Sequence, residues 1–336
     1  RSSFGRAKTW YTYALGAALA IPIVGTAGLW RNYIQDVVEA VEAGTHSTAS
    51  QPVASTLTVL QDNAQDMPLS QLITAKINLP DAYNDGCQQS QSDPDVLTCD
   101  YGQTKTPKKT IALIGGSHST QWLPALEIIG KKNSLEIINI TKGSCTFGAV
   151  PGTNASCREW NVSVIEELAQ LRPDAVVTIA TRPIFGAKHN SIIEDVPTEY
   201  IQQWKKVGQL GIGIIAIRDN PWFHTDIASC VARNQDEPLN CALPRKSLLL
   251  PLNPAEKIKS EVKNLSLVDM TNYLCTETTC PVVSQNILMY RDKHHLSVPY
   301  VESLASALEQ KMQVSRPDLF MSDPAPATLL AEKPKQ

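Results

Sequence analysis

The chain has 336 residues, of which 43% are hydrophobic and 19% are charged, and its formal net charge is −3. This composition is typical of a globular protein with a sizeable core. The slightly negative net charge gives no basic field, which argues against nucleic acid as a partner. The first residue is Arg1 rather than Met, so we expect a further part of the protein to precede this chain.

An uncharged stretch of 20 residues, Tyr11–Trp30, lies near the N-terminus. A helix of this length spans about 30 Å, the thickness of a bilayer core. Aromatic residues flank the stretch, as at membrane interfaces, and the basic residues before it (Arg1, Arg6 and Lys8) predict a cytoplasmic N-terminal side. We therefore predict a transmembrane helix within residues 1–33 and a cell-membrane protein whose remaining chain is extracytoplasmic. A signal peptide and a buried core helix are the alternatives.

Three further segments have the composition of connecting or terminal regions. Residues 34–80 begin with a short helical pattern and continue as a small, polar, aperiodic stretch, which predicts a linker. Residues 81–109 carry two cysteines among turn residues and are predicted to form a disulfide-pinned extension. Residues 316–336 are rich in Pro and Ala at their end and predict a disordered tail.

Eight cysteines fall into four close pairs along the sequence. Neither Cys-x-x-Cys spacing nor neighbouring histidines accompany them, so the pattern does not indicate a metal site. Four local disulfides formed in an oxidising compartment are the favoured interpretation, and eight buried thiols are the alternative. Nearest-neighbour pairing is the simplest of many connectivities, and it joins Cys87–Cys99, Cys145–Cys157, Cys230–Cys241 and Cys275–Cys280.

Residues 110–315 alternate between short apolar runs and amphipathic segments of helical period. This alternation predicts right-handed βαβ units and one parallel sheet of about five strands with helices on both faces. An active site in such a sheet lies at the carboxyl ends of the strands. The predicted strands are Ile111–Ile114, Leu135–Ile140, Ala175–Ala180, Ile212–Ile217 and Leu265–Val268, and the predicted helices are Gln121–Lys132, Glu159–Leu171, Thr198–Leu210 and Ala255–Lys263.

The first predicted strand ends in Gly115-Gly116-Ser117-His118-Ser119, and a helix follows. Glycines let the chain turn sharply and let a substrate approach the backbone. A serine in this turn lies near a helix N-terminus, where backbone amides favour a developing negative charge. The turn therefore predicts a nucleophilic serine, with a helix-capping serine as the alternative.

A second motif, Tyr290-Arg-Asp-Lys-His-His-Leu-Ser297, comes near the C-terminus. Asp292 and His295 are three residues apart, so the carboxylate can orient the imidazole, which can then activate a serine. Alone, this motif could be a surface turn or a helix cap. Together with the Gly-Gly-Ser turn it predicts a triad in which Ser117 is the nucleophile and His295 is the general base.

These motifs resemble the SGNH (GDSL-type) superfamily of esterases and acyltransferases. The match is closest to the SGNH domain fused to the C-terminus of membrane acyltransferase family 3 proteins, and it runs from about Asp81 to Gln310. It implies a three-layer, flavodoxin-like α/β fold built on a parallel sheet. It also implies a preceding multi-span acyltransferase domain outside this chain. Further matching segments are Cys99–Gly102, Gln121–Leu126, Lys142–Cys145, Arg218–Pro221 and the Cys275/Cys280 hairpin.

The resemblance implies an acyl relay. The membrane domain would deliver an acyl group, typically acetyl from cytoplasmic acyl-CoA, to Ser117. A hydroxyl of a cell-envelope glycan or glycolipid would then accept it. His295 would deprotonate first Ser117 and then the acceptor, while Asp292 holds the ring. No cofactor and no metal are expected in this domain itself.

The resemblance also implies an oxyanion hole formed by the backbone amides of Ser117 and Gly143, although Gly143 could be a simple turn glycine. The chain departs from the family pattern in two places. Gly116 replaces the usual Asp before the serine, which puts the bracing of the turn in doubt. Arg182 follows the third strand, where the superfamily has an asparagine. Its guanidinium is predicted to bind an oxyanion, carboxylate or phosphate, or to form a structural ion pair.

Two weaker candidates for the substrate cleft are His118, which is predicted to cap or line the serine turn, and Asn220 at the end of the fourth strand. An Asx turn before Pro221 is the alternative for Asn220. Two other functions stay open. One is an esterase, in which water takes the acyl group. The other is a non-catalytic glycan-binding module, which Gly116 favours and the intact triad disfavours.

Overall fold

The computed structural model describes residues 28–32, 67–185 and 192–321. The chain divides into two compact units, Arg1–Gln51 and Pro52–Gln336. In the first, residues 28–32 are helical. Most of the predicted membrane span, linker and tail lies outside the described residues. Within the described ranges, no helix is long and apolar enough to cross a membrane.

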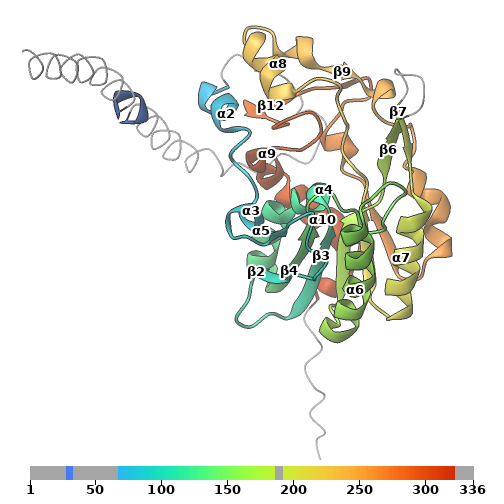
Figure 1. Cartoon of the computed structure of the whole chain (residues 1–336). Coiled ribbons are helices and arrows are strands. Elements are labelled where there is room, and N and C mark those ends of the chain that lie inside the picture. The colour runs from blue at the N-terminus through green and yellow to red at the C-terminus, as the bar shows by residue number, and fades with distance from the viewer. Residues whose placement is uncertain (1–27, 33–66, 186–191, 322–336) are drawn as a thin grey trace, which may run out of the picture. The chain divides into compact units, whose positions relative to one another are not determined.

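A seven-stranded sheet lies at the centre of the second unit (Figure 1). Five strands run parallel in the order β4-β3-β5-β8-β10, and they are the five that the apolar runs predict. Because β3 lies between β4 and β5, the winding direction reverses at β3, and ligands of such sheets bind at the carboxyl side of this switch point. The strands are β3 (Lys109–Gly115), β4 (Leu135–Lys142), β5 (Ala175–Ile179), β8 (Gly213–Ile217) and β10 (Leu265–Val268).

The predicted extension contributes the other two strands. β1 (Gln88–Gln89) pairs parallel with β4, and β2 (Cys99–Gly102) pairs antiparallel with it. Both strands cover the edge of β4 that would otherwise expose unpaired backbone groups. The Cys87–Cys99 disulfide holds the two segments together beside that edge. The sheet is therefore wider than the predicted five strands because the extension pairs with it.

Helices cover both faces of the sheet, as predicted. Neighbouring residues of β3 point to opposite faces, so Ile111 and Leu113 join one hydrophobic core while Ala112 and Ile114 join the other. Residues of α5 and α10 belong to the first core, and residues of α6 and α7 belong to the second. These helices are α5 (Leu123–Asn133), α6 (Ala155–Leu171), α7 (Thr198–Gln209) and α10 (Ala305–Ser315).

One predicted helix differs in type. The segment predicted as a helix over Ala255–Lys263 is the 3-10 helix η5 (Pro254–Glu261), in which Ala255 is the one buried residue. So little apolar contact gives a regular α-helix little support. The shorter elements of the domain include α2 (Leu69–Thr74), α3 (Asp81–Asn84), α4 (Ser117–Thr120), β6 (Arg182–Phe185), β7 (Ile192–Asp195), α8 (Ile227–Arg233) and α9 (Val298–Ser303).

All four predicted cysteine pairs are bonded, and the described residues contain no free cysteine. Each bond closes a short loop of the chain. Cys145–Cys157 ties the loop after β4 to α6, next to the carboxyl edge of the sheet.

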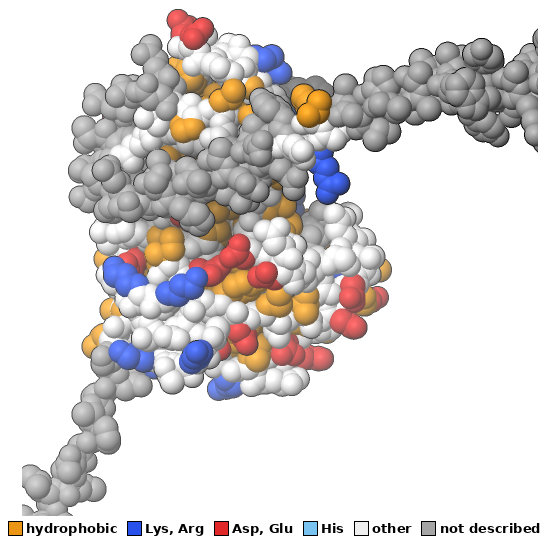
Figure 2. All heavy atoms as spheres, turned by 90° about the vertical axis from the view of Figure 1, so that its left-hand side faces the viewer, with side chains coloured by type: hydrophobic (Ala, Val, Ile, Leu, Met, Phe, Trp, Pro, Cys, Tyr) orange, Lys and Arg blue, Asp and Glu red, His pale blue; other side chains and the backbone are white. Residues whose placement is uncertain are grey.

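The face drawn in Figure 2 carries acidic and basic side chains side by side, with hydrophobic side chains between them.

Candidate active site

The nucleophile turn is shaped by two glycines at the carboxyl end of β3. Gly115 has φ +135°, and a Cβ there would lie 2.3 Å from the Ser119 hydroxyl oxygen, so only glycine fits. A Cβ on Gly116 would lie 3.0 Å from the carbonyl oxygen of Cys145. The disulfide loop therefore crowds the position at which the family usually has Asp. The chain then enters α4 with Ser117 as its first residue.

The structure brings the three predicted triad residues together. His295 Nε2 lies 2.8 Å from Ser117 Oγ, although 178 positions separate the two residues in the sequence. His295 Nδ1 lies 2.7 Å from Asp292 Oδ2. With the Nδ1 proton donated to Asp292, the Nε2 lone pair is free to accept the Ser117 hydroxyl proton, which is the arrangement that serine activation needs.

The Asp292 carboxylate is held by its own loop. Its Oδ1 accepts the backbone amides of His294 at 2.9 Å and His295 at 2.8 Å. Burial opposes the charged form, but the hydrogen bonds from the His295 ring and these amides outweigh it and lower the pKa of Asp292. Asp292 is therefore an anion at neutral pH. Burial lowers the pKa of His295 despite the opposing hydrogen bond to Asp292.

This direction gives a pH prediction for acylation of Ser117. The base must be neutral, and its pKa in the folded protein is below the ordinary value of 6.5. We expect kcat/KM for an activated ester to be independent of pH above the ordinary histidine pKa and to fall at pH values below 6.5, as His295 becomes protonated. A pH–rate profile with p-nitrophenyl acetate measures this. An inflection above the ordinary histidine pKa would contradict the assignment.

Asn220, predicted as a substrate-binding residue, instead holds the histidine loop. Its side chain is buried, accepts from Gln121 Nε2 at 2.8 Å and donates to the carbonyl oxygens of Pro221 and His294. Gln121 Oε1 in turn accepts the backbone amide of Leu296 at 2.9 Å. The oxygen and the nitrogen of the Asn220 side-chain amide are thus both hydrogen-bonded within the protein. This arrangement does not agree with the prediction that Asn220 contacts the substrate.

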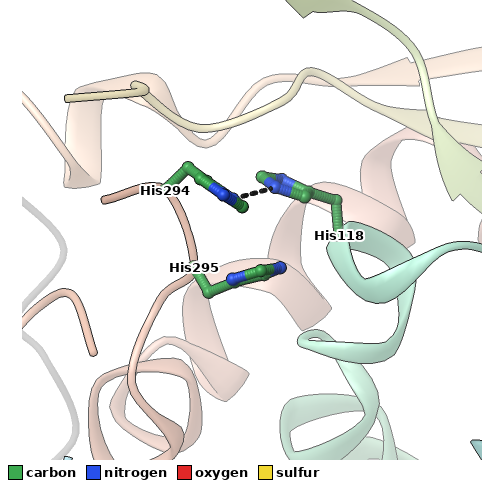
Figure 3. A group of neighbouring side chains, drawn as sticks. All are labelled: His118, His294 and His295. Atoms are coloured by element: carbon green, nitrogen blue, oxygen red, sulfur yellow. Dashed lines mark hydrogen bonds between the residues drawn. The ribbon is translucent and has the colours of Figure 1, made fainter. Parts of the chain in front are cut away.

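His118 does not cap the serine turn. Its ring belongs to a second series of hydrogen-bonded side chains, beside the triad. Its Nδ1 lies 2.7 Å from Asp219 Oδ1, and its Nε2 lies 2.9 Å from His294 Nδ1 (Figure 3). Trp222 stacks on His118 and on His294, with ring centroids 4.6 and 4.3 Å apart. Its indole N–H donates to the other oxygen of Asp219. Sequence reasoning missed Trp222 and His294, although Asp219 and Trp222 follow the carboxyl end of β8, where ligand-binding groups are expected.

The predicted oxyanion hole needs one correction. The Ser117 amide is the first of α4, and the first amides of a helix have no intrahelical acceptor. The Gly143 amide, however, donates to the carbonyl oxygen of Gln89 at 2.9 Å. It extends the pairing of β1 with β4. Gly143 is therefore not available as the second donor.

Arg182 is half-buried at the start of β6, beyond the carboxyl end of β5. It lies close to Tyr200, which is buried. Burial raises the pKa of Tyr200 to about 12, while the charge of Arg182 acts in the opposite direction. Binding of an anionic group by Arg182 stays a prediction.

A parallel α/β sheet that brings a serine, a histidine and an aspartate into one hydrogen-bonded chain at its carboxyl edge has the architecture of the SGNH class. A family model described as the SGNH domain fused to AT3 domains matches residues 86–310. The match covers more than half of the chain, and the chain belongs to this family.

Among solved structures, the chain is similar to the periplasmic domain of the lipopolysaccharide acetyltransferase of Salmonella ser. Paratyphi A. The two are 19% identical, the TM-score is 0.47, and the alignment covers 63% of this chain and 86% of that chain. No curated protein sequence matches the chain.

Proposed function

We propose that this chain is the extracytoplasmic SGNH domain of a membrane O-acyltransferase. Ser117 takes an acyl group, with acetyl as the expected one, and passes it to a hydroxyl of a cell-envelope glycan or glycolipid. The observation that carries the proposal is the Ser117–His295–Asp292 chain, with separations of 2.8 and 2.7 Å, in a family whose domains are fused to acyltransferases.

In the first step, His295 Nε2 takes the Ser117 hydroxyl proton as Oγ attacks the carbonyl carbon of an acyl donor. The Ser117 amide is proposed to stabilise the oxyanion that develops. The intermediate then expels the leaving group, which takes the proton back from His295 and leaves an ester on Oγ. Asp292 stabilises the imidazolium while it exists.

In the second step, the acceptor hydroxyl replaces the leaving group. Its proton moves to His295 Nε2 as its oxygen attacks the ester carbonyl carbon. Collapse of the intermediate breaks the bond to Ser117 Oγ, which recovers a proton from His295. The acyl group now forms an ester on the acceptor, and the domain returns to its starting state. The same base therefore serves both steps.

Two observations support the cellular setting. Four disulfides form and persist in an oxidising compartment, which favours the outer side of the cytoplasmic membrane. The family's fusion to acyltransferase domains supports a covalently attached multi-span domain that takes the acyl group from cytoplasmic acyl-CoA. On this proposal the SGNH domain needs no cofactor of its own.

Hydrolysis uses the same residues with water as the acceptor, so the test must separate the two outcomes. We expect p-nitrophenyl acetate to place an acetyl group on Ser117, detectable as a mass increase of a single peptide. Added envelope glycan should then speed loss of this group and gain an acetyl ester. Free acetate as the sole product, at a rate unaffected by glycan, would favour the esterase. A Ser117 that a fluorophosphonate probe does not label would favour the glycan-binding module.

A further inference from the structure

Three histidine rings, His118, His294 and His295, meet beside Ser117 (Figure 3). Each offers one ring nitrogen, and these nitrogens lie within 4.8 Å of one another. The acyl-transfer mechanism uses the ring of His295 and leaves the other two unexplained. Imidazole nitrogens in such numbers are typical ligands of divalent transition metal ions.

Two of the rings already have the outer partners that metal-binding histidines usually have. His118 Nδ1 faces Asp219 at 2.7 Å, and His295 Nδ1 faces Asp292 at 2.7 Å. A carboxylate on one ring nitrogen fixes the tautomer and raises the basicity of the other. On each of these two rings the Nε2 lone pair, which now faces Ser117 or His294, is therefore the one that a cation would take.

The third ring can join with little movement. His118 Nε2 and His294 Nδ1 are 2.9 Å apart. Two nitrogens bound tetrahedrally to one zinc ion, each at about 2.0–2.1 Å, lie about 3.3–3.4 Å from each other. An ion can therefore replace the shared proton if these rings separate by a few tenths of an ångström and tilt so that both lone pairs converge on it. The proton of His294 then moves from Nδ1 to Nε2, so the His294 ring stays neutral. The His295 ring must turn further than the other two rings to reach the ion.

The charges around the cluster also favour a dication. Asp219 and Asp292 place two carboxylates behind the rings. The Asp219 side chain is 4% exposed, and those of His118 and His295 are each 13% exposed. Trp222 covers the His118 and His294 rings from one side. A divalent ion would be matched by two negative charges in surroundings that screen them less than water does.

We propose that His118, His294 and His295 form a binding site for a divalent transition metal ion such as Zn²⁺, and that the bound ion switches off Ser117. The ion takes the Nε2 lone pair of His295, which the serine needs for its proton. No bond to the substrate forms or breaks in this step. The inhibitory consequence rests on the proposed acyl-serine function, whereas binding of the ion does not.

The first test measures inhibition with the full 336-residue chain. Zn²⁺ is expected to inhibit turnover of p-nitrophenyl acetate, and EDTA should restore it. Within each variant, activity with zinc is divided by activity without it, so a changed basal rate does not matter. His294→Gln should raise the inhibitory zinc concentration at least about tenfold. His224→Gln, the same change at an exposed histidine outside the cluster, should leave it unchanged.

The second test measures binding without catalysis. Ser117→Ala should bind one Co²⁺ per chain, with the visible absorption of a tetrahedral nitrogen site, and both Ser117→Ala/His294→Gln and Ser117→Ala/His118→Gln should lose that spectrum. An unchanged spectrum in both double variants, or equal zinc inhibition of wild type and His294→Gln, would overturn the site. Co²⁺ binding by a chain whose Ser117 no ester or phosphonate labels would instead count against the proposed function alone.

Discussion

Replacing Ser117 by Ala is expected to abolish acyl transfer while leaving the domain folded. Loss of a triad nucleophile typically lowers turnover by about four to six orders of magnitude. The Ser117 side chain is only half-buried and lies at the carboxyl edge of the sheet, so its removal leaves the core intact. Acetyl transfer to the acceptor and thermal unfolding by circular dichroism measure the two effects separately.

Ser119→Ala is the matched control, because Ser119 lies two residues along in α4 and its side chain is turned into the protein. It should keep most of the activity. The decisive comparison uses cells that lack any other copy of the gene. Acceptor modification at the wild-type rate in cells that carry only Ser117→Ala would show that the acyl-serine mechanism is wrong.

The central sheet could be predicted because its strands are buried on both faces. Such strands appear in a sequence as continuous apolar runs, and Ile111–Ile114 and Ala175–Ile179 are fully buried runs of this kind. β1 could not be predicted in the same way, since Gln88–Gln89 is too short to show any period. β1 also explains why the prediction of Gly143 as an oxyanion donor was wrong, because the Gly143 amide donates to a carbonyl oxygen of that strand.

The triad could be predicted because each half is a local motif. Gly-Gly-Ser sits in one turn, and the Asp292 carboxylate reaches His295 within the same loop. The second chain of hydrogen bonds is different, because 101 positions separate His118 from Asp219, and no periodicity records such a contact. The sequence likewise gives no sign that His294 lies beside the triad. The Asx turn at Asp292 brings its ring to within 4.2 Å of the His295 ring, centroid to centroid.

The largest expected loss of stability comes from Glu194→Ala. Glu194 and Arg218 form an ion pair at 2.7 Å in which their side chains are 5% and 2% exposed. Glu194 also accepts the Arg218 Nε–H at 2.9 Å and the Thr181 hydroxyl at 2.9 Å. Without Glu194, the buried Arg218 charge is balanced only by Asp269, which is 36% exposed and lies 3.1 Å from Arg218 Nη1. We therefore expect the free energy of unfolding to fall by about 3 kcal/mol. Urea denaturation measures this.

Glu261→Ala is the control, because Glu261 pairs with Lys205 at 3.6 Å and both side chains are about half exposed. It should cost less than about 1 kcal/mol. Equal losses for the two variants would contradict the argument from burial.

Glu194 also accepts a hydrogen bond from the Thr181 hydroxyl, which in turn accepts one from the Asp219 backbone amide at 3.1 Å. Arg218 directly precedes Asp219 in the chain. We therefore expect Glu194→Ala, in conditions where it is still folded, to disturb the Asp219–His118 hydrogen bond and weaken zinc inhibition as well, because the same ion pair supports both the sheet and the histidine cluster.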